Sequence, residues 1–203
     1  MPTVTTAAPG LREQKKQRTA DELRRVALEL FNARGFDAVT VDDIVAAAEV
    51  SKTTFYRYFD SKDDVLLGTA TDKLELMHAA LLGRPATEPA LDAVRNAFLS
   101  VAQRYEDERD RNLTVGRIMR TTPALAARNL EHQAAWEALL RDFFATRDGA
   151  DEPGLRHCVL AATVVASLRT AMDYWVTDDA GTDLPTVVDA ALRVTIHDLG
   201  ESA

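Results

Sequence analysis

The sequence predicts an all-α protein in which a tri-helical N-terminal head precedes a larger helical body. Apolar residues recur with helical spacing along nearly all of the 203 residues, and no stretch alternates clearly enough to predict a β-sheet. Clusters of Gly, Pro and Asp interrupt this pattern where helices are expected to end. We expect the head over residues 18–62 and the body over residues 63–203, preceded by a disordered basic arm over residues 1–17.

The chain is acidic overall, with 24 Lys and Arg against 32 Asp and Glu and a net charge of −8. This balance argues against a protein that coats nucleic acid nonspecifically, because such binding needs clustered cations. The segment from residue 12 to residue 25 differs, since six cations and three acids leave it a charge of 6 − 3 = +3. The acidity therefore leaves room for a local basic contact near the N-terminus.

Three features predict a soluble cytoplasmic protein with no membrane contact. Cys158 is the single cysteine, so no internal disulfide can form, as suits a reducing compartment. No uninterrupted apolar stretch reaches the roughly eighteen residues of a transmembrane helix. Residues 1–10 are rich in Thr, Ala and Pro, and they lack the apolar segment of a signal peptide.

An apolar stripe predicts the first helix. Its members recur every three or four residues: Leu23, Val26, Ala27, Leu30 and Phe31. Gly35 suits the position that follows the last helical turn. Thr19 and Glu22 can form a capping box at the start, or the helix begins earlier.

Residues 40–59 predict two short helices joined by a tight turn. Thr40 can cap the first helix, with Asp43 at its third position. The buried face of this helix has the spacing i, i+3, i+4 and i+7: Val41, Ile44, Val45 and Ala48. In the turn, Val50 can fill the angle between the helices, and Ser51 can cap the second one.

The second short helix has an inward and an outward face. Phe55 and Phe59 lie four residues apart and are expected to point inward. The outward side chains are a cation, two hydroxyls, a phenol and a guanidinium: Lys52, Thr53, Thr54, Tyr56 and Arg57. Such a set suits the major groove of DNA and its flanking phosphates. A merely solvated surface is the alternative, because tri-helical modules also occur in proteins that bind no DNA.

Residues 35–44 (GFDAVTVDDI), 50–59 (VSKTTFYRYF) and 61–62 (SK) resemble the DNA-binding domain of the TetR family. The resemblance extends over about residues 18–66. It implies phosphate contacts from Thr40, Thr54, Tyr56 and Lys62, and base-edge contacts from Lys52, Thr53 and Arg57. It also implies a basic arm before the first helix, which residues 12–18 can supply. The acids beside Lys62, at positions 60, 63 and 64, suit the first turn of a helix.

Longer helices are predicted for the body, near residues 61–82, 88–110, 112–121, 123–146, 153–177 and 185–199. Small residues such as Ala162, Ala166 and Ser167 in the fifth of these helices permit a close helix crossing. The resemblance to TetR proteins implies that the last two helices pair with their mates in a four-helix dimer interface. The alternative is that both are ordinary core helices.

A ligand pocket in the body needs apolar walls and a few polar groups. Candidate wall residues are Phe98, Tyr105, Met119, Trp136, Phe143, Met172 and Trp175. Candidate polar residues, which suit an anionic or polar ligand, are Arg117, Arg120, His132 and Arg169. For each residue alone, core packing or solvation is the alternative. Residues 117–125, with Glu131 and Trp136, resemble a TetR branch that includes the mycofactocin regulator and is described as binding acyl-CoA-like ligands.

Other protein classes find less support. Glu75 and His78 have the Glu-x-x-His spacing of di-iron bundles, but no second copy of the motif exists, so a surface pair is favoured. No Gly-rich phosphate loop, zinc-ligand spacing or nucleophile elbow is present. Cys158 is interpreted as a small buried hydrophobe, with a redox sensor as the alternative. We therefore expect neither an enzyme nor a bound cofactor or metal.

The combined prediction is a TetR-type, ligand-responsive repressor that binds a palindromic operator in double-stranded DNA as a homodimer. A hydrophobic molecule such as a fatty acyl-CoA is the expected small-molecule effector, and nucleoid association in the cytoplasm is the expected location. The alternative is a TetR-fold DNA-binding protein used for chromosome organisation or for recruiting other proteins.

Overall fold

A computed structural model describes residues 11–178 and 181–195, apart from the side chains of residues 11–14, 16, 67–73 and 128–132. Every regular element in this part of the chain is a helix, which confirms the predicted all-α class. The helices divide between two compact units, residues 1–68 and 69–203. The boundary falls inside α4 (Lys62–Leu82).

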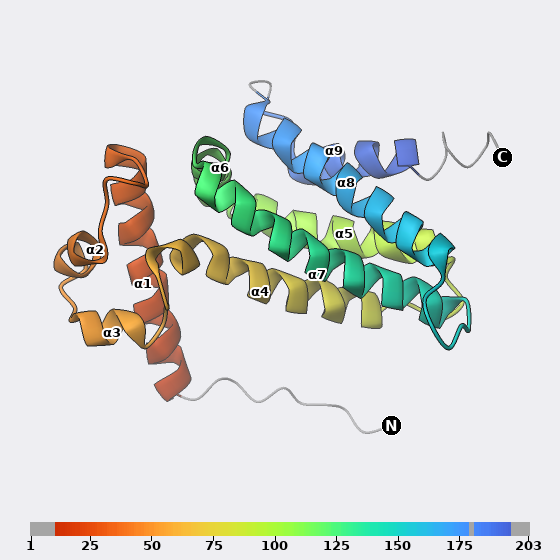
Figure 1. Ribbon diagram of the computed structural model, residues 1–203, viewed down its shortest axis with the longest axis horizontal. Helices are drawn as coiled ribbons and strands as arrows, with labels where there is room; N and C mark the ends of the chain where they lie inside the picture. Colours follow the sequence, from red (N-terminus) through yellow and green to blue (C-terminus); the bar gives the residue numbers. More distant parts are fainter. Residues whose placement is uncertain (1–10, 179–180, 196–203) are drawn as a thin grey trace. The chain divides into compact units, whose positions relative to one another are not determined.

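The first unit is the tri-helical head. It holds α1 (Leu11–Arg34), α2 (Val41–Ala47) and α3 (Lys52–Tyr56), drawn from red to orange in Figure 1. All three helices bury apolar side chains in one core, whose most buried members are Leu23, Ala27, Phe31, Val39, Ile44 and Phe55. The predicted apolar stripe of α1 is thus buried inside the head, where α1 packs against α2. A tri-helical N-terminal head is confirmed, while its bounds at residues 18 and 62 stay a prediction.

The start of α1 differs from the predicted capping box. The helix begins at Leu11, so Thr19 lies inside it, and the Thr19 hydroxyl donates to the Lys15 carbonyl oxygen at 3.0 Å. Glu22 pairs with Arg25 instead of capping. The box is therefore wrong, because the Lys, Arg and Gln residues before Thr19 are good helix formers that extend the helix backward. Residues 11–17 of the predicted arm are helical, and residues 1–10 lie outside the described part.

The end of α1 is as predicted. Gly35 adopts a φ of +82°, the left-handed conformation that glycine tolerates best. Its N–H donates to the Phe31 carbonyl oxygen at 2.9 Å. The chain then turns toward α2 through a loop that buries Phe36 and Val39 in the head.

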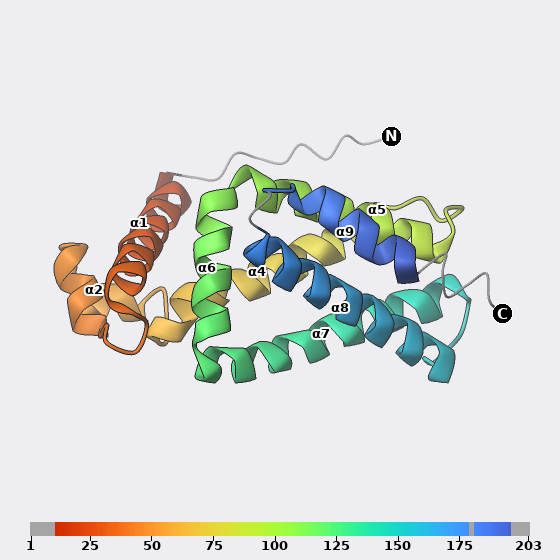
Figure 2. The same ribbon diagram turned by 90° about the horizontal axis from the view of Figure 1, so that it is seen from above.

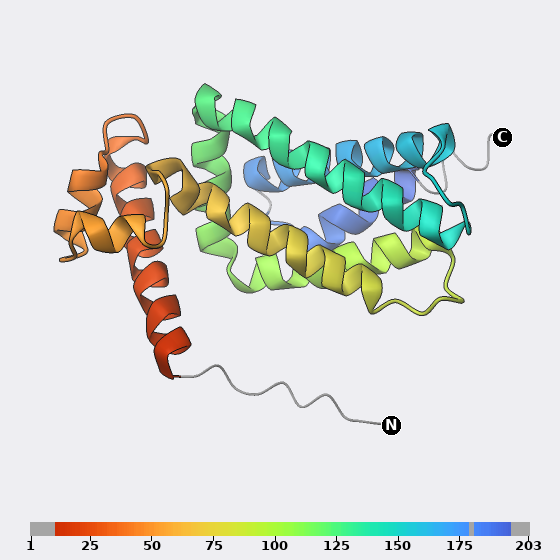
Figure 3. The ribbon, with the colours of Figure 1, turned by 60° about the horizontal axis from the view of Figure 1, so that its bottom comes forward.

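The second unit contains the rest of α4 with α5 (Ala90–Asp107), α6 (Arg109–Thr121), α7 (Pro123–Arg147), α8 (Leu155–Thr177) and α9 (Leu184–Arg193). α8 packs against α7 and α9, and α9 packs against α5; Figure 2 shows α9 beside both neighbours. α6 stands steeply to α7, as Figures 2 and 3 show, and the turn between them is followed by Pro123 at the first helical position.

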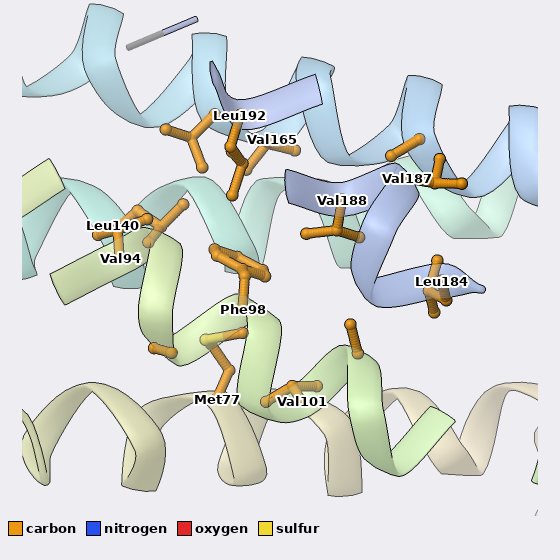
Figure 4. Packing of buried hydrophobic residues seen from close by; sticks show 14 of the residues in the cluster. Met77, Val94, Phe98, Val101, Leu140, Val165, Leu184, Val187, Val188 and Leu192 are labelled. Atoms are coloured by element: carbon orange, nitrogen blue, oxygen red, sulfur yellow. The ribbon is translucent and has the colours of Figure 1, made fainter. Parts of the chain in front are cut away.

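One apolar core holds the body together. On α5, successive turns present Val94, Phe98 and Val101 to it, at the helical spacing i, i+4 and i+7. Figure 4 shows Met77 of α4 and Val188 of α9 on either side of Phe98. Burying one such side chain stabilises the fold by about 1.5–3 kcal/mol relative to leaving it exposed.

The predicted body helices correspond to α4–α9, with one break in a different place. The prediction ended the second helix at residue 110, whereas α5 ends at Asp107 and α6 begins at Arg109. Glu106 and Arg109 explain the break, because they hold the loop before α9. Glu106 accepts from the Leu184 N–H at 2.9 Å, and Arg109 donates to the Thr182 carbonyl oxygen at 3.2 Å. The last residues predicted for α9, 196–199, lie outside the described part.

A second polar contact joins α5 to α9. Asp189 accepts hydrogen bonds from Arg95 of α5 at 2.6 Å and from Arg193 at 2.8 Å. Burial alone would raise the pKa of Asp189, but the hydrogen bonds from Arg193 and Arg95 outweigh it and hold that pKa below its usual value.

Cys158 is exposed on α8, so its interpretation as a buried hydrophobe is wrong. Its neighbour His157 takes the inward position at the start of the helix. Glu75 and His78 are both exposed on α4. Among the described residues, no helix is long and apolar enough to cross a lipid bilayer.

Candidate nucleic-acid interface

Thr40 and Asp43 fix the start of α2. The Thr40 hydroxyl accepts from the Asp43 N–H at 3.2 Å, and the Asp43 carboxylate accepts from the Thr40 N–H at 2.8 Å. These bonds form a capping box, which confirms the predicted cap. The hydrogen bonds from Thr40 lower the pKa of Asp43, with Arg34 adding to the effect. Thr40 is exposed, and its hydroxyl also donates to the Asp43 carboxylate, so a hydrogen bond from this hydroxyl to a phosphate would replace that contact.

The turn between α2 and α3 depends on a left-handed residue. Glu49 has a φ of +53°, a conformation that costs a side-chain-bearing residue energy. Val50 then donates to the Val45 carbonyl oxygen at 3.0 Å, and the Ser51 hydroxyl accepts from the Thr54 N–H at 3.1 Å. The predicted Ser51 cap is confirmed, whereas nothing in the sequence indicated the backbone conformation of Glu49.

α3 presents the predicted outward face. Phe55 and Phe59 are buried, and their rings pack with centroids 5.5 Å apart. The other side of the helix exposes Lys52, Thr53, Tyr56 and Arg57. Thr54 is half-buried, and its hydroxyl lies 3.0 Å from that of Ser51. The aromatic anchors thus hold a short helix so that a cation, a hydroxyl, a phenol and a guanidinium share its solvent side.

Two of the outward cations already have partners within the head. The Lys52 ammonium lies 2.7 Å from a carboxylate oxygen of Asp42, on α2. The Arg57 guanidinium lies over the Tyr58 ring and donates to its hydroxyl at 3.2 Å. Both cations are exposed, so each of them remains accessible to DNA despite these contacts.

Lys62 has a structural contact that sequence reasoning missed. Its ammonium donates to the carbonyl oxygens of Phe36 at 2.8 Å and Val39 at 2.9 Å, and it lies 4.4 Å from the centre of the Phe36 ring. The lysine therefore ties the start of α4 to the loop before α2. A phosphate contact from Lys62, which stays a prediction, would use the remaining N–H of the same ammonium.

The predicted basic arm is described in part. Lys15 and Arg18 are exposed on the first turns of α1. The side chains of Arg12 and Lys16 lie outside the described residues. Their proposed contact with DNA stays a prediction.

The predicted pocket residues of the body fall into two groups. Six belong to the apolar core or pack against it: Phe98, Tyr105, Trp136, Phe143, Met172 and Trp175. Phe98 stacks on Trp136 with ring centroids 5.7 Å apart, and burial raises the pKa of Tyr105. Met119 is half-buried outside this cluster.

The polar pocket candidates lie elsewhere. Three of them are exposed and do not join the apolar candidates in the core: Arg117, Arg120 and Arg169. The side chain of His132 lies outside the described residues. A polar ligand group would therefore need a donor other than these three arginines if it entered the core.

Trp175 is such a donor; the sequence predicted it as a wall residue of the pocket, but not as a hydrogen-bond donor. Its side chain is fully buried, and its Nε1–H finds no hydrogen-bond acceptor among the described residues. The Arg109 guanidinium lies 5.4 Å from the centre of the Trp175 ring. An indole N–H buried in this way destabilises the fold by about 1–3 kcal/mol unless something accepts from it.

Comparison with known proteins identifies the family. Residues 23–69 match the family described as "Bacterial regulatory proteins, tetR family", and residues 88–199 match the "MftR C-terminal domain". The chain belongs to the TetR family. The first match contains all of α2 and α3, and the second contains α5, α6, α7, α8 and α9.

Named relatives agree with this assignment. The transcriptional regulator TcmR of Streptomyces glaucescens is 39% identical over 72% of this chain and 68% of its own length. The putative mycofactocin biosynthesis regulator MftR of Mycobacterium tuberculosis is 29% identical over 82% of this chain and 84% of its own. A crystal structure of the Thermus thermophilus TetR-family repressor FadR, in complex with lauroyl-CoA, has a TM-score of 0.53 and 26% identity, over 86% of this chain and 92% of that one.

The head is thus the helix-turn-helix of a TetR-type transcriptional regulator, and this class of protein binds DNA through it. The resemblance to the TetR family read from residues 35–62 is confirmed. The branch that includes the mycofactocin regulator, read from residues 117–125 with Glu131 and Trp136, is confirmed as well, since the body matches the MftR type. One of these relatives is named as a transcriptional regulator and the other as a putative one.

Proposed function

We propose that this TetR-type protein is an effector-responsive repressor that binds a palindromic operator as a homodimer. The observation that carries the proposal is the face of α3, where Lys52, Thr53, Tyr56 and Arg57 are exposed on a helix anchored by Phe55. A recognition helix of this kind enters the major groove and reads base edges with its first residues. In this assignment Lys52, Thr53 and Arg57 read bases, while Thr40, Thr54, Tyr56 and Lys62 contact phosphates.

The homodimer is supported by the outer face of α8. Apolar and small side chains recur there at spacings of three and four residues, and all are exposed: Leu155, Val159, Ala162, Ala166, Thr170 and Tyr174. Contiguous apolar surface of this kind marks an interaction site, and a two-fold axis lets one patch pair with its own copy. Two heads related by that axis would read the two halves of a palindrome.

The effector is proposed to be a fatty acyl thioester. T. thermophilus FadR was crystallised with lauroyl-CoA, and this chain shares its fold at 26% identity. The apolar core of the body, with the Phe98–Trp136 stack, offers aromatic surface to an acyl chain. The Nε1–H of Trp175 supplies a buried donor, which a hydrocarbon tail does not need but a thioester carbonyl oxygen can use.

Coupling between effector and DNA is proposed to run through α4, the helix that belongs to both units. Met77 on its C-terminal half is buried in the body core, whereas Lys62 at its start holds the loop before α2. A ligand that prefers one position of α4 would change operator affinity by the ratio of its affinities for the two states. Acting on chromosomal DNA, such a repressor would work in the cytoplasm, at the nucleoid.

The test begins with operator sequences selected from random duplexes, followed by titration of the operator complex with lauroyl-CoA. We expect release of DNA by lauroyl-CoA, but not by CoA alone, because the acyl chain enters the core. Trp175→Phe, which removes the donor together with part of the ring, should weaken lauroyl-CoA binding while Trp136 still reports it by fluorescence. Unchanged operator affinity at saturating lauroyl-CoA would overturn this effector. Many dispersed, unrelated binding sites across the chromosome would point instead to chromosome organisation.

A further inference from the structure

An acidic residue of α2 reaches across the turn to the first residue of the recognition helix. The Asp42 carboxylate and the Lys52 ammonium lie 2.7 Å apart, and more than half of each side chain is exposed. Lys52 occupies the first position of α3, where the helix dipole disfavours a cation. The hydrogen bond from Lys52 to Asp42, more than the charge attraction, raises the pKa of Lys52. Without DNA, the ammonium is therefore held at α2.

This contact changes what Lys52 can do at different DNA sequences. Any duplex offers phosphates, and a lysine that reaches one strengthens binding to all sequences equally. A guanine edge in the major groove offers two acceptors, O6 and N7, to one ammonium. An exposed ion pair is weak, so it can be exchanged for two such acceptors more readily than for a single screened phosphate contact.

We propose that Asp42 is a specificity-determining residue, which keeps Lys52 off phosphates on non-operator DNA and releases it where the operator presents a guanine edge. The proposal rests on the placement of α3 in the major groove. Asp42 acts through Lys52 and is a positioning residue. Its own negative charge repels phosphates, which also lowers the affinity for non-operator DNA.

The salt dependence of DNA binding separates this role from a plain charge effect. Each phosphate neutralised by the protein adds about 0.9 to the slope of log K against log salt concentration. In Asp42→Asn, Lys52 is free to meet a phosphate on any duplex. We therefore expect the slope for non-operator DNA to steepen by about 0.9. Affinity for that DNA should rise by roughly two- to fivefold, the strength of an exposed ion pair. Operator affinity should rise less, so the specificity ratio falls.

Three control variants make the experiment decisive. Asp37→Asn removes the same charge from an exposed residue of the same head, and it should leave the slope unchanged. Lys52→Ala should also leave the non-operator slope unchanged, because wild-type Lys52 makes no phosphate contact there. The double variant Asp42→Asn/Lys52→Ala should return to the wild-type slope. All four variants and the wild type are compared as full-length protein on one operator and one scrambled duplex.

The same set of variants distinguishes the ways in which the inference can fail. Equal slopes for Asp42→Asn and Asp37→Asn would overturn it, and so would a steeper slope for Asp42→Asn that persists without Lys52. If Lys52→Ala left operator affinity and base preference unchanged, the result would instead contradict the proposed placement of α3 in the major groove, on which the inference rests.

Discussion

Gly116 lies on α6 where this helix approaches α8 so closely that a larger side chain would clash with α8. A Cβ at Gly116 would come within 2.5 Å of Val176 Cγ2, whereas Val176 Cβ lies 3.6 Å away. Carbon atoms pack at about 3.5–4.0 Å. Val176 is buried, and as a β-branched residue in a helix it has one strongly preferred rotamer. In Gly116→Ala the strain therefore falls on the packing of α6 against α8.

Two opposing terms set the size of the effect. Exchanging a helical Gly for Ala stabilises by about 1 kcal/mol. Overpacking destabilises by about 1–3 kcal/mol. Gly116→Ala alone should therefore leave the free energy of unfolding unchanged or lower it by up to about 2 kcal/mol. In Val176→Ala only the 3.6 Å contact remains, so Gly116→Ala should there stabilise by about 1 kcal/mol.

The measurement is a double-mutant cycle in urea unfolding, run at one protein concentration because the proposed dimerisation would contribute to apparent stability. We expect a coupling free energy of about 1–3 kcal/mol between the two positions, equal to the overpacking term. If Gly116→Ala stabilised the protein equally with and without the Val176 methyl groups, the close approach of α6 and α8 would be refuted.

Three further outcomes are expected. Glu49→Gly should raise the free energy of unfolding by up to about 1 kcal/mol, because residue 49 has a left-handed backbone conformation. The control Ala46→Gly, in the helical backbone of α2, should lower it by about as much. Equal effects of the two variants in urea unfolding would contradict the turn geometry. Tyr56→Phe should weaken binding to every duplex, whereas Lys52→Ala should relax preference at particular base pairs; a panel of operator variants that does not separate the two contradicts their assignment. Asp189→Asn should destabilise the body at neutral pH and have no effect in strong acid. The lowered folded-state pKa means that the carboxylate's contribution is present above its unfolded value of about 3.9 and is lost as pH falls through the folded value; an equal loss at every pH would exclude the ionised contact.

Local features of the head could be predicted because their causes lie within a few residues. The Ser51 cap needs only the Ser51 hydroxyl and a backbone N–H three residues away, and the Thr40–Asp43 box adds one carboxylate at the same distance. The inward positions of Phe55 and Phe59 follow from helical spacing in the same way. The left-handed Glu49 could not be predicted, because Glu has no preference for that conformation and the packing of α2 and α3 imposes it.

Contacts between distant segments are what the sequence left open. Lys62 bonds to carbonyl oxygens 26 and 23 residues away, and this showed only in the structure. The break at Glu108 has no Gly or Pro to mark it, since contacts with the loop before α9 determine it. In the body, aromatic candidates such as Trp136 were recognisable by type, but the exposure of Arg117 depends on how α6 packs.

Selection of DNA from random duplexes by the full-length protein tests the central claim most directly, namely that two copies of α3 read an operator. We expect enrichment of an inverted repeat whose half-sites are centred about 10 base pairs or somewhat more apart, bound by two chains. Selection with Lys52→Ala should relax the sequence at matching positions of both half-sites. Enrichment of a single unrepeated site, or of no sequence at all, would contradict the claim.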